Sequence, residues 1–158
     1  MTYEEIPLPT ETVNISDVVS ELLPAYTEDA QARNLRFTVL IEPDIVIQTN
    51  KDSFRQMLTV LLDNAIKYTP DGGSVRLSLA RDGKYILIIA ENTCDTSLEP
   101  DPERLFERFY RGDTARTQKK GSGYGIGLSA ARAICENFGG KLTAEYSSDD
   151  SIRFTARF

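Results

Sequence analysis

The spacing of apolar residues along the chain predicts three helices. The first lies over 17–34, where apolar side chains recur every three or four residues, and Ser16 is its expected N-cap. The second runs from about 51 to 68, with Asn50 as its cap. The third covers 124–138. Each pattern is that of a helix with one buried face.

Alternating apolar and polar residues predict strands between these helices. The clearest case is a hairpin over 74–92, because two such runs meet at Asp82-Gly83, a dipeptide typical of tight hairpin turns. Its second strand is apolar enough to be central in a sheet. The remaining expected strands are 12–16, 36–42, 45–50, 141–147 and 151–158.

This order of elements predicts an α+β fold of two layers. We expect a mixed, mostly antiparallel sheet with three helices on one face. Residues 1–11 are polar and contain two prolines, so they read as an extended lead-in, and 12–158 form one domain. A long polar stretch, 91–123, separates the hairpin from the third helix, and loops of that length are often functional.

Composition narrows the possible functions. The 158 residues carry a net charge of −6, which disfavours nucleic acid as a partner, and contain neither a membrane span nor a signal peptide pattern, so we expect a soluble domain without membrane contact. Cys94 and Cys135 lack metal-ligand spacing and are expected to be reduced thiols without a role. Histidine is absent, which removes the commonest general base and metal ligand.

A glycine-rich run, GSGYGIG, occupies 121–127 and leads directly into the third helix. Glycines let the backbone pass close to a ligand, and a helix N-terminus offers unpaired N–H groups, so this run suits a polyphosphate. It is not a Walker loop, because Lys119 and Lys120 precede the glycines, nor a dinucleotide loop, because it does not follow a strand directly. The alternative is a flexible linker with a glycine-rich helix cap.

The second helix places a polar residue, Asn64, on its apolar stripe. Asn64 either bonds the backbone as a structural residue or uses its carbonyl oxygen to coordinate Mg²⁺ brought in by phosphates. Lys67, close to the helix end, either complements the helix dipole or reaches a phosphate. The stripe consists of Met57, Val60, Leu61, Asn64 and Tyr68.

Three segments resemble, in order and spacing, the catalytic ATP-binding domain of bacterial sensor histidine kinases: LLDNAIKYTPDGG, LFERFYRGD and GSGYGIGLSAARAICENFGGKL. They correspond to the N, F and G2 boxes of that family, and the resemblance covers most of 50–158. It implies the Bergerat ATP-binding fold, Mg²⁺ held by Asn64, catalytic roles for Asn64 and Lys67, an F box containing Phe106 and Phe109, and an ATP lid at about 111–123. The residues that it places around ATP are Asn64, Lys67, Tyr68, Asn92, Asp95, Phe109, Arg111, Lys119, Lys120, Gly123, Tyr124, Gly125, Ile126, Gly127 and Leu128.

Two positions depart from the family pattern. The G1 box usually reads Asp-x-Gly-x-Gly, whereas this chain has ENTCDTSLEP, with Asn92 in the place of the aspartate and Asp95 as the other candidate. An asparagine carbonyl can still accept from the adenine amino group, but through a weaker, neutral bond. Val60 stands where hydrolytic relatives carry a glutamate that activates water, so efficient ATP hydrolysis is not expected.

The resemblance implies a protein-histidine kinase domain that binds ATP and Mg²⁺ and transfers the γ-phosphoryl group to a histidine. Because the chain has no histidine, the acceptor is expected on a separate dimerisation domain of the same kinase, with a response regulator downstream. The family also implies a cytoplasmic domain of a membrane-anchored parent. The alternative is a docking or scaffold module that has lost nucleotide use, and a third interpretation is a hydrolytic relative, which Val60 disfavours.

Overall fold

The computed structural model describes residues 9–94, 101–107, 124–148 and 150–158. The predictions for Asp95, Phe109, Arg111, Lys119, Lys120 and Gly123 concern residues outside these ranges. In chain order, the elements are β1 (Glu11–Asn14), α1 (Ile15–Ala32), β2 (Arg36–Ile41), β3 (Val46–Thr49), α2 (Lys51–Tyr68), β4 (Ser74–Asp82), β5 (Tyr85–Thr93), the 3₁₀ helix η3 (Pro102–Phe106), α4 (Tyr124–Asn137), β6 (Lys141–Ser148) and β7 (Ser151–Arg157).

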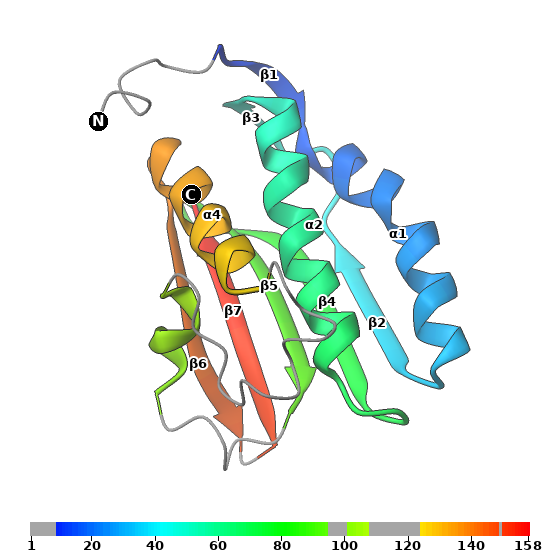
Figure 1. The fold of residues 1–158 in the computed structure, drawn as a ribbon. Coiled ribbons are helices and arrows are strands. Elements are labelled where there is room, and N and C mark those ends of the chain that lie inside the picture. The colour runs from blue at the N-terminus through cyan, green and yellow to red at the C-terminus, as the bar shows by residue number, and fades with distance from the viewer. Residues whose placement is uncertain (1–8, 95–100, 108–123, 149) are drawn as a thin grey trace.

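Five strands form the main sheet in the order β2-β4-β5-β7-β6 (Figure 1). Only the β2–β4 pair is parallel among the described strands, because the chain crosses over through β3 and α2 between them. The other three pairs are antiparallel. β5 is therefore central, as predicted, and the sheet is mixed and mostly antiparallel.

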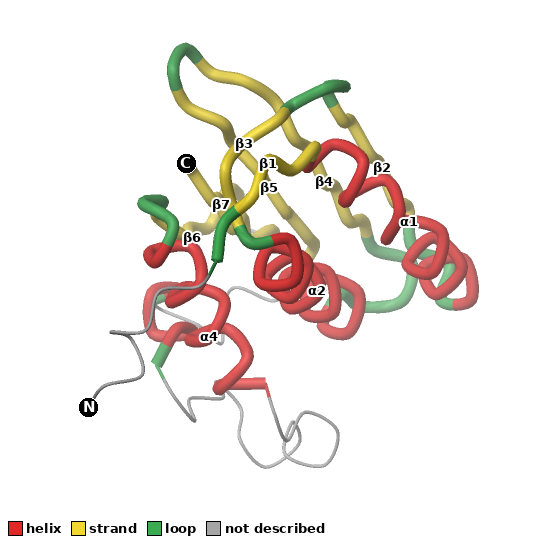
Figure 2. The backbone as a smooth tube through the Cα atoms, turned by 90° about the horizontal axis from the view of Figure 1, so that it is seen from above, coloured by secondary structure: helices red, strands yellow, loops and turns green. Residues whose placement is uncertain are grey.

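β1 does not join this sheet, which the sequence pattern did not reveal. It pairs antiparallel with β3 in a separate two-stranded sheet next to the start of α2. The helices α1, α2 and α4 lie together on one face of the main sheet (Figure 2). The two-layer α+β prediction is confirmed.

The start of α1 differs from its prediction. The helix begins at Ile15, and Asn14 is its N-cap, with Oδ1 accepting a hydrogen bond from the Asp17 N–H at 3.1 Å. Ser16 is buried instead, donates its hydroxyl to the carbonyl of Glu42 at 2.6 Å and accepts from the Ile45 N–H at 3.0 Å. The Ser16 hydroxyl therefore links α1 to the β2–β3 connection by two hydrogen bonds and does not cap the helix.

The start of α2 agrees with its prediction. Asn50 accepts from the Ser53 N–H at 2.9 Å, and its own amide donates to the Pro9 carbonyl at 2.9 Å.

The turn of the β4–β5 hairpin is shifted by one residue from its prediction, because Asp82 pairs with Tyr85 and the loop consists of Gly83 and Lys84. Gly83 has a φ of +63°, a conformation that favours glycine and explains the turn.

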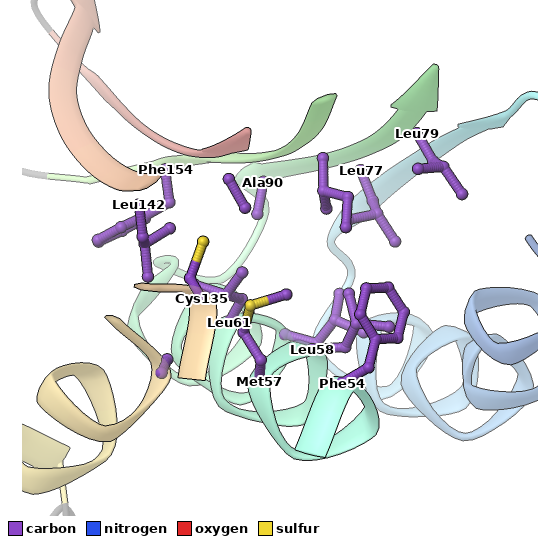
Figure 3. Packing of buried hydrophobic residues seen from close by; sticks show 14 of the residues in the cluster. Phe54, Met57, Leu58, Leu61, Leu77, Leu79, Ala90, Cys135, Leu142 and Phe154 are labelled. Carbon is purple, nitrogen blue, oxygen red and sulfur yellow. The ribbon is translucent and has the colours of Figure 1, made fainter. Parts of the chain in front are cut away.

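The core lies between the sheet and the helices (Figure 3). Side chains of α2 and α4 meet alternate residues of the central strands, such as Leu77 and Ala90. Cys135 is fully buried in this layer, and burial raises the pKa of its thiol to about 12, which keeps it protonated. No helix within the described ranges is long and apolar enough to cross a membrane.

Candidate nucleotide-binding site

The site is built on α2, which presents two different faces. One face is fully in the core, with Phe54, Met57, Leu58, Leu61, Leu62, Ala65 and Ile66 buried. The flank beside it carries Val60 and, one turn later, Asn64, both half-buried. Asn64 is therefore at the edge of the core and not inside it.

The Asn64 amide has no hydrogen bond to another side chain or to the backbone within the described part of the chain. The sequence left open whether Asn64 is a structural residue or a ligand-binding one. In the part of the chain that the structure describes, its carbonyl oxygen accepts no hydrogen bond and lies at the edge of the helical layer.

The start of α4 lies against this flank of α2. The two helices run in opposite directions (Figure 1). Gly127 packs next to Val60, since a Cβ atom built at Gly127 would lie 3.6 Å from Val60 Cγ1. Leu128 is fully buried in the core and anchors the same turn. Asn64, one turn beyond Val60, is consequently beside the first turn of α4.

This first turn offers positive charge. The first backbone N–H groups of any helix have no partner within the helix, and in α4 these include the groups of Tyr124, Gly125 and Ile126. They add to the positive end of the helix dipole, which attracts phosphate. Asn64 and the start of α4 together make one acceptor and several donors available at one place.

The C-terminal end of α2 is fixed by a residue that the sequence did not indicate. The Arg33 guanidinium donates to the carbonyls of Ile66 and Thr69, and its Nε lies 2.9 Å from the Asp71 carboxylate. A cation at a helix C-terminus interacts favourably with the unpaired carbonyls there. In the sequence, Arg33 is only an arginine at the end of α1, and this feature is too common to predict its contacts with α2.

Lys67 and Tyr68 occupy this same end of α2. Lys67 is exposed, Tyr68 is half-buried, and the Lys67 ammonium lies 5.8 Å from the centre of the Tyr68 ring. Arg33 therefore holds the last turn in which both of these predicted site residues lie. Their predicted contacts with ATP stay predictions.

Asn92 lies near the end of β5 and faces the helical layer. It is 5% exposed, between Val75 of β4 and Ile152 of β7 in register. Its Nδ2 donates to the backbone carbonyl of Thr93 at 2.9 Å. Among the described residues Oδ1 accepts no hydrogen bond, and it is the atom that adenine recognition would need.

The short helix η3 precedes the undescribed segment and is tied to α4. Phe106 is buried, contacts Phe154 edge-on at 5.8 Å between ring centres, and lies 4.1 Å beneath the guanidinium carbon of Arg132. Arg132 also lies 2.6 Å from Glu103. Phe106 is therefore a core residue. Arg132 and Glu103 were not predicted, because nothing in their spacing marks two residues 29 positions apart as partners.

The described residues contain no group of three or more Cys, Asp or Glu side chains arranged to hold a metal ion. A hard cation held by the Asn64 carbonyl oxygen would take further oxygen ligands from phosphates and water.

Comparisons with known proteins agree with this geometry. A family model described as histidine kinase-, DNA gyrase B-, and HSP90-like ATPase matches residues 49–158. The probable sensor protein PcoS of Escherichia coli is 38% identical over 115 residues, covering 73% of this chain and 24% of its own. The sensor protein CiaH of Streptococcus pneumoniae is 39% identical over 114 residues, covering 72% and 25%. The chain thus spans about a quarter of the length of these relatives.

Solved structures show the same fold. The catalytic domain of the histidine kinase ThkA superposes with a TM-score of 0.81 at 22% identity, covering 96% of this chain and 95% of that one. Full-length ShkA in complex with AMPPNP gives a TM-score of 0.76 at 21% identity, covering 96% and 31%. Both likenesses extend over almost the whole chain.

Proposed function

The chain belongs to the histidine kinase-, DNA gyrase B-, and HSP90-like ATPase family and has the fold of a histidine kinase catalytic domain, and from this premise we propose that it binds Mg²⁺-ATP and phosphorylates a histidine. One observation carries the proposal. Asn64, with no protein partner among the described residues, lies beside the first turn of α4, because Gly127 packs on Val60 one turn away. A polyphosphate with its cation needs this combination of an oxygen acceptor and unpaired N–H groups.

The chain's own groups act mainly by binding and positioning. The first-turn N–H groups of α4 neutralise charge on the phosphates, and Lys67 contributes a positive charge from the end of α2. Asn64 orients the cation, and Asn92 Oδ1 accepts from the adenine amino group. A bound Mg²⁺ would neutralise negative charge on the phosphates. The undescribed residues Arg111, Lys119 and Lys120 are further proposed phosphate contacts.

The transfer breaks the bond between the γ-phosphorus and the oxygen bridging it to the β-phosphate. A new bond forms to a ring nitrogen of the acceptor histidine, and ADP leaves. The acceptor lies outside these 158 residues, which contain no histidine. We place it on a dimerisation domain of the same kinase, with a response regulator as the next acceptor and the cytoplasm as the location.

Water is a poor competitor in this site. Val60 is on the same flank of α2 as Asn64 and packs against Gly127, so this position carries an apolar side chain and no base. Without a base, the activation of water at the γ-phosphate is slow. The proposal is therefore a kinase with little ATP hydrolysis of its own.

Incubation of the full-length protein with γ-labelled ATP and Mg²⁺ tests the proposal. The expected product is protein-bound phosphate that is stable in base and lost in acid, and Asn64→Ala should abolish it. Label released mainly as free phosphate would favour a hydrolytic ATPase. Absence of both label transfer and nucleotide binding would favour the docking module, in which the neutral Asn92 and the missing G1 glycines reflect lost nucleotide use.

A further inference from the structure

A hollow of about 350 Å³ opens on the face of the main sheet opposite α1, α2 and α4. Residues of β2, β4 and β5 and the first residue of β7 line it. Apart from Asn92, whose side chain faces the helices, its polar members alternate with core residues along the strands, so they point away from the helices. The lining residues are Arg36, Thr38, Ser74, Val75, Arg76, Glu91, Asn92, Thr93 and Ser151.

Two arginines supply positive charge to this hollow. Arg36 and Arg76 come from the neighbouring parallel strands β2 and β4, where Arg36 pairs with Ser74 and Arg76 with Thr38. The Arg36 Nε donates to the Ser74 hydroxyl at 3.2 Å, which directs its side chain across β4. In the described residues, neither arginine has a carboxylate within ion-pair distance.

The one carboxylate of the lining is engaged elsewhere. Glu91 accepts from the Ser147 hydroxyl on β6 and lies 3.8 Å from a guanidinium nitrogen of Arg153 on β7. Arg153 also pairs with Glu145 at 3.4 Å, and Glu91 is the register partner of Arg76, so the lining carries two positive charges and one negative charge. Arg36 and Arg76 keep their positive charge over the hollow, although the chain as a whole carries −6.

Hydroxyl groups complete the lining. Thr38, Ser74, Thr93 and Ser151 each contribute one. The Thr93 hydroxyl donates to the Ser74 carbonyl at 3.4 Å, and the Ser151 hydroxyl donates to the Asp150 carboxylate at 3.5 Å. Guanidinium groups bind planar or tetrahedral oxyanions through paired N–H donors, and hydroxyls add single donors. These side chains therefore offer hydrogen-bond donors and positive charge, which suit an oxyanion.

We propose that this hollow binds the phosphate or carboxylate group of a small molecule through Arg36 and Arg76. The site is separate from the proposed nucleotide site, because it lies on the opposite face of the sheet. Along β5, Glu91 and Thr93 face the hollow, whereas Asn92 between them faces the helices. The inference stands on these contacts and does not depend on the kinase proposal.

Titration of the ¹⁵N-labelled 158-residue chain with inorganic phosphate, and separately with succinate, at constant ionic strength tests it. The expected result is a saturable shift of the amide signals of Thr38, Ser74 and Thr93 with at least one anion. Saturation by phosphate alone identifies a phosphate ligand, and saturation by succinate alone a carboxylate ligand. The double variant Arg36→Gln/Arg76→Gln should weaken binding about tenfold or more.

Arg157→Gln is the matched control. Arg157 lies on the same sheet face but at the far end of β7, where its guanidinium carbon is 4.5 Å from the centre of the Tyr85 ring. This variant removes the same charge and should leave the affinity unchanged. The proposal is overturned if no saturable shift occurs, if the double variant binds equally well, or if the shifts centre on Asn64 and Gly127. Thermal unfolding of each variant verifies that it is folded.

Discussion

Gly127 of α4 faces Val60 of α2, and a Cβ atom at Gly127 would lie 3.6 Å from Val60 Cγ1. This contact determines where the glycine-rich run meets the helix that carries Asn64. Because 3.6 Å is ordinary van der Waals distance, the two helices are close without being tightly wedged. The relationship brings the positive end of α4 to Asn64, and the predictions about nucleotide binding depend on it.

Asn92 is predicted to recognise the adenine base. Asn92→Ala should weaken binding of a non-hydrolysable ATP analogue, because the Oδ1 acceptor is lost. Asn92→Asp should strengthen it by about tenfold, because a charged acceptor forms a stronger bond. Calorimetry with ATP and GTP analogues measures both affinity and base preference. Loss of binding in Asp95→Ala, with Asn92→Ala unaffected, would assign the base to Asp95 instead.

Arg33 is predicted to stabilise the end of α2. Arg33→Met should lower the free energy of unfolding by about 1–3 kcal/mol, because the carbonyls of Ile66 and Thr69 lose their donor. Urea unfolding measures this loss. Asp71→Asn is the control, since the Asp71 side chain is 78% exposed and such a pair contributes less than about 1 kcal/mol. Equal losses of unfolding free energy in the two variants would show that the Arg33–Asp71 ion pair, and not the bonds to the two carbonyls, accounts for the stabilisation.

Gly140 is predicted to tolerate no side chain. A Cβ atom there would lie 2.7 Å from the Arg157 carbonyl oxygen and 3.0 Å from Cys135 Sγ. Gly140→Ala should therefore destabilise the domain by about 1–3 kcal/mol. Gly127→Ala, which has room, should be neutral or stabilising by up to about 1 kcal/mol. The midpoints of thermal unfolding of the two variants test this. Equal midpoints would contradict the close packing at Gly140.

Glu42 should make stability depend on acid pH. The Arg81 backbone N–H, at 3.0 Å from Oε1, and then its guanidinium hold the pKa of Glu42 below its ordinary 4.5. A carboxyl whose pKa is lowered by folding stabilises the protein above the unfolded pKa, and this contribution disappears as pH falls through the folded one. The urea midpoint of the wild type should exceed that of Glu42→Gln at about pH 6 and approach it near pH 3. A difference that is independent of pH would contradict this account.

The fold was largely predictable, because its signals are local. Asn50 caps α2 through a residue three positions away, and the β4–β5 hairpin forms around a two-residue loop. Ser16 illustrates the limit. Its sequence context suits a cap, but its partners are 26 and 29 residues away, and Asn14, two residues earlier, is the cap instead. Spacing within one helix contains no information about such partners.

The candidate site was predictable only in part, for the same reason. The boxes that resemble the kinase family include Asn64 and the glycine run, and the structure packs Gly127 against Val60, one turn from Asn64. The residues that support these positions were not visible, because Arg33 and Arg132 act through partners on other elements. The separate β1–β3 sheet was missed likewise, since alternation identifies a strand but not its neighbour.

The central claim is tested most directly by calorimetric titration of the wild-type domain and of Asn64→Ala with a non-hydrolysable ATP analogue, with and without Mg²⁺. Leu61→Ala is the control, because Leu61 is 2% exposed and its truncation should cost about 2–5 kcal/mol of stability. We predict that the wild type binds more tightly with Mg²⁺ and that Asn64→Ala stays folded but loses this binding. Unchanged Mg²⁺-dependent binding by Asn64→Ala, or its unfolding, would contradict the assignment.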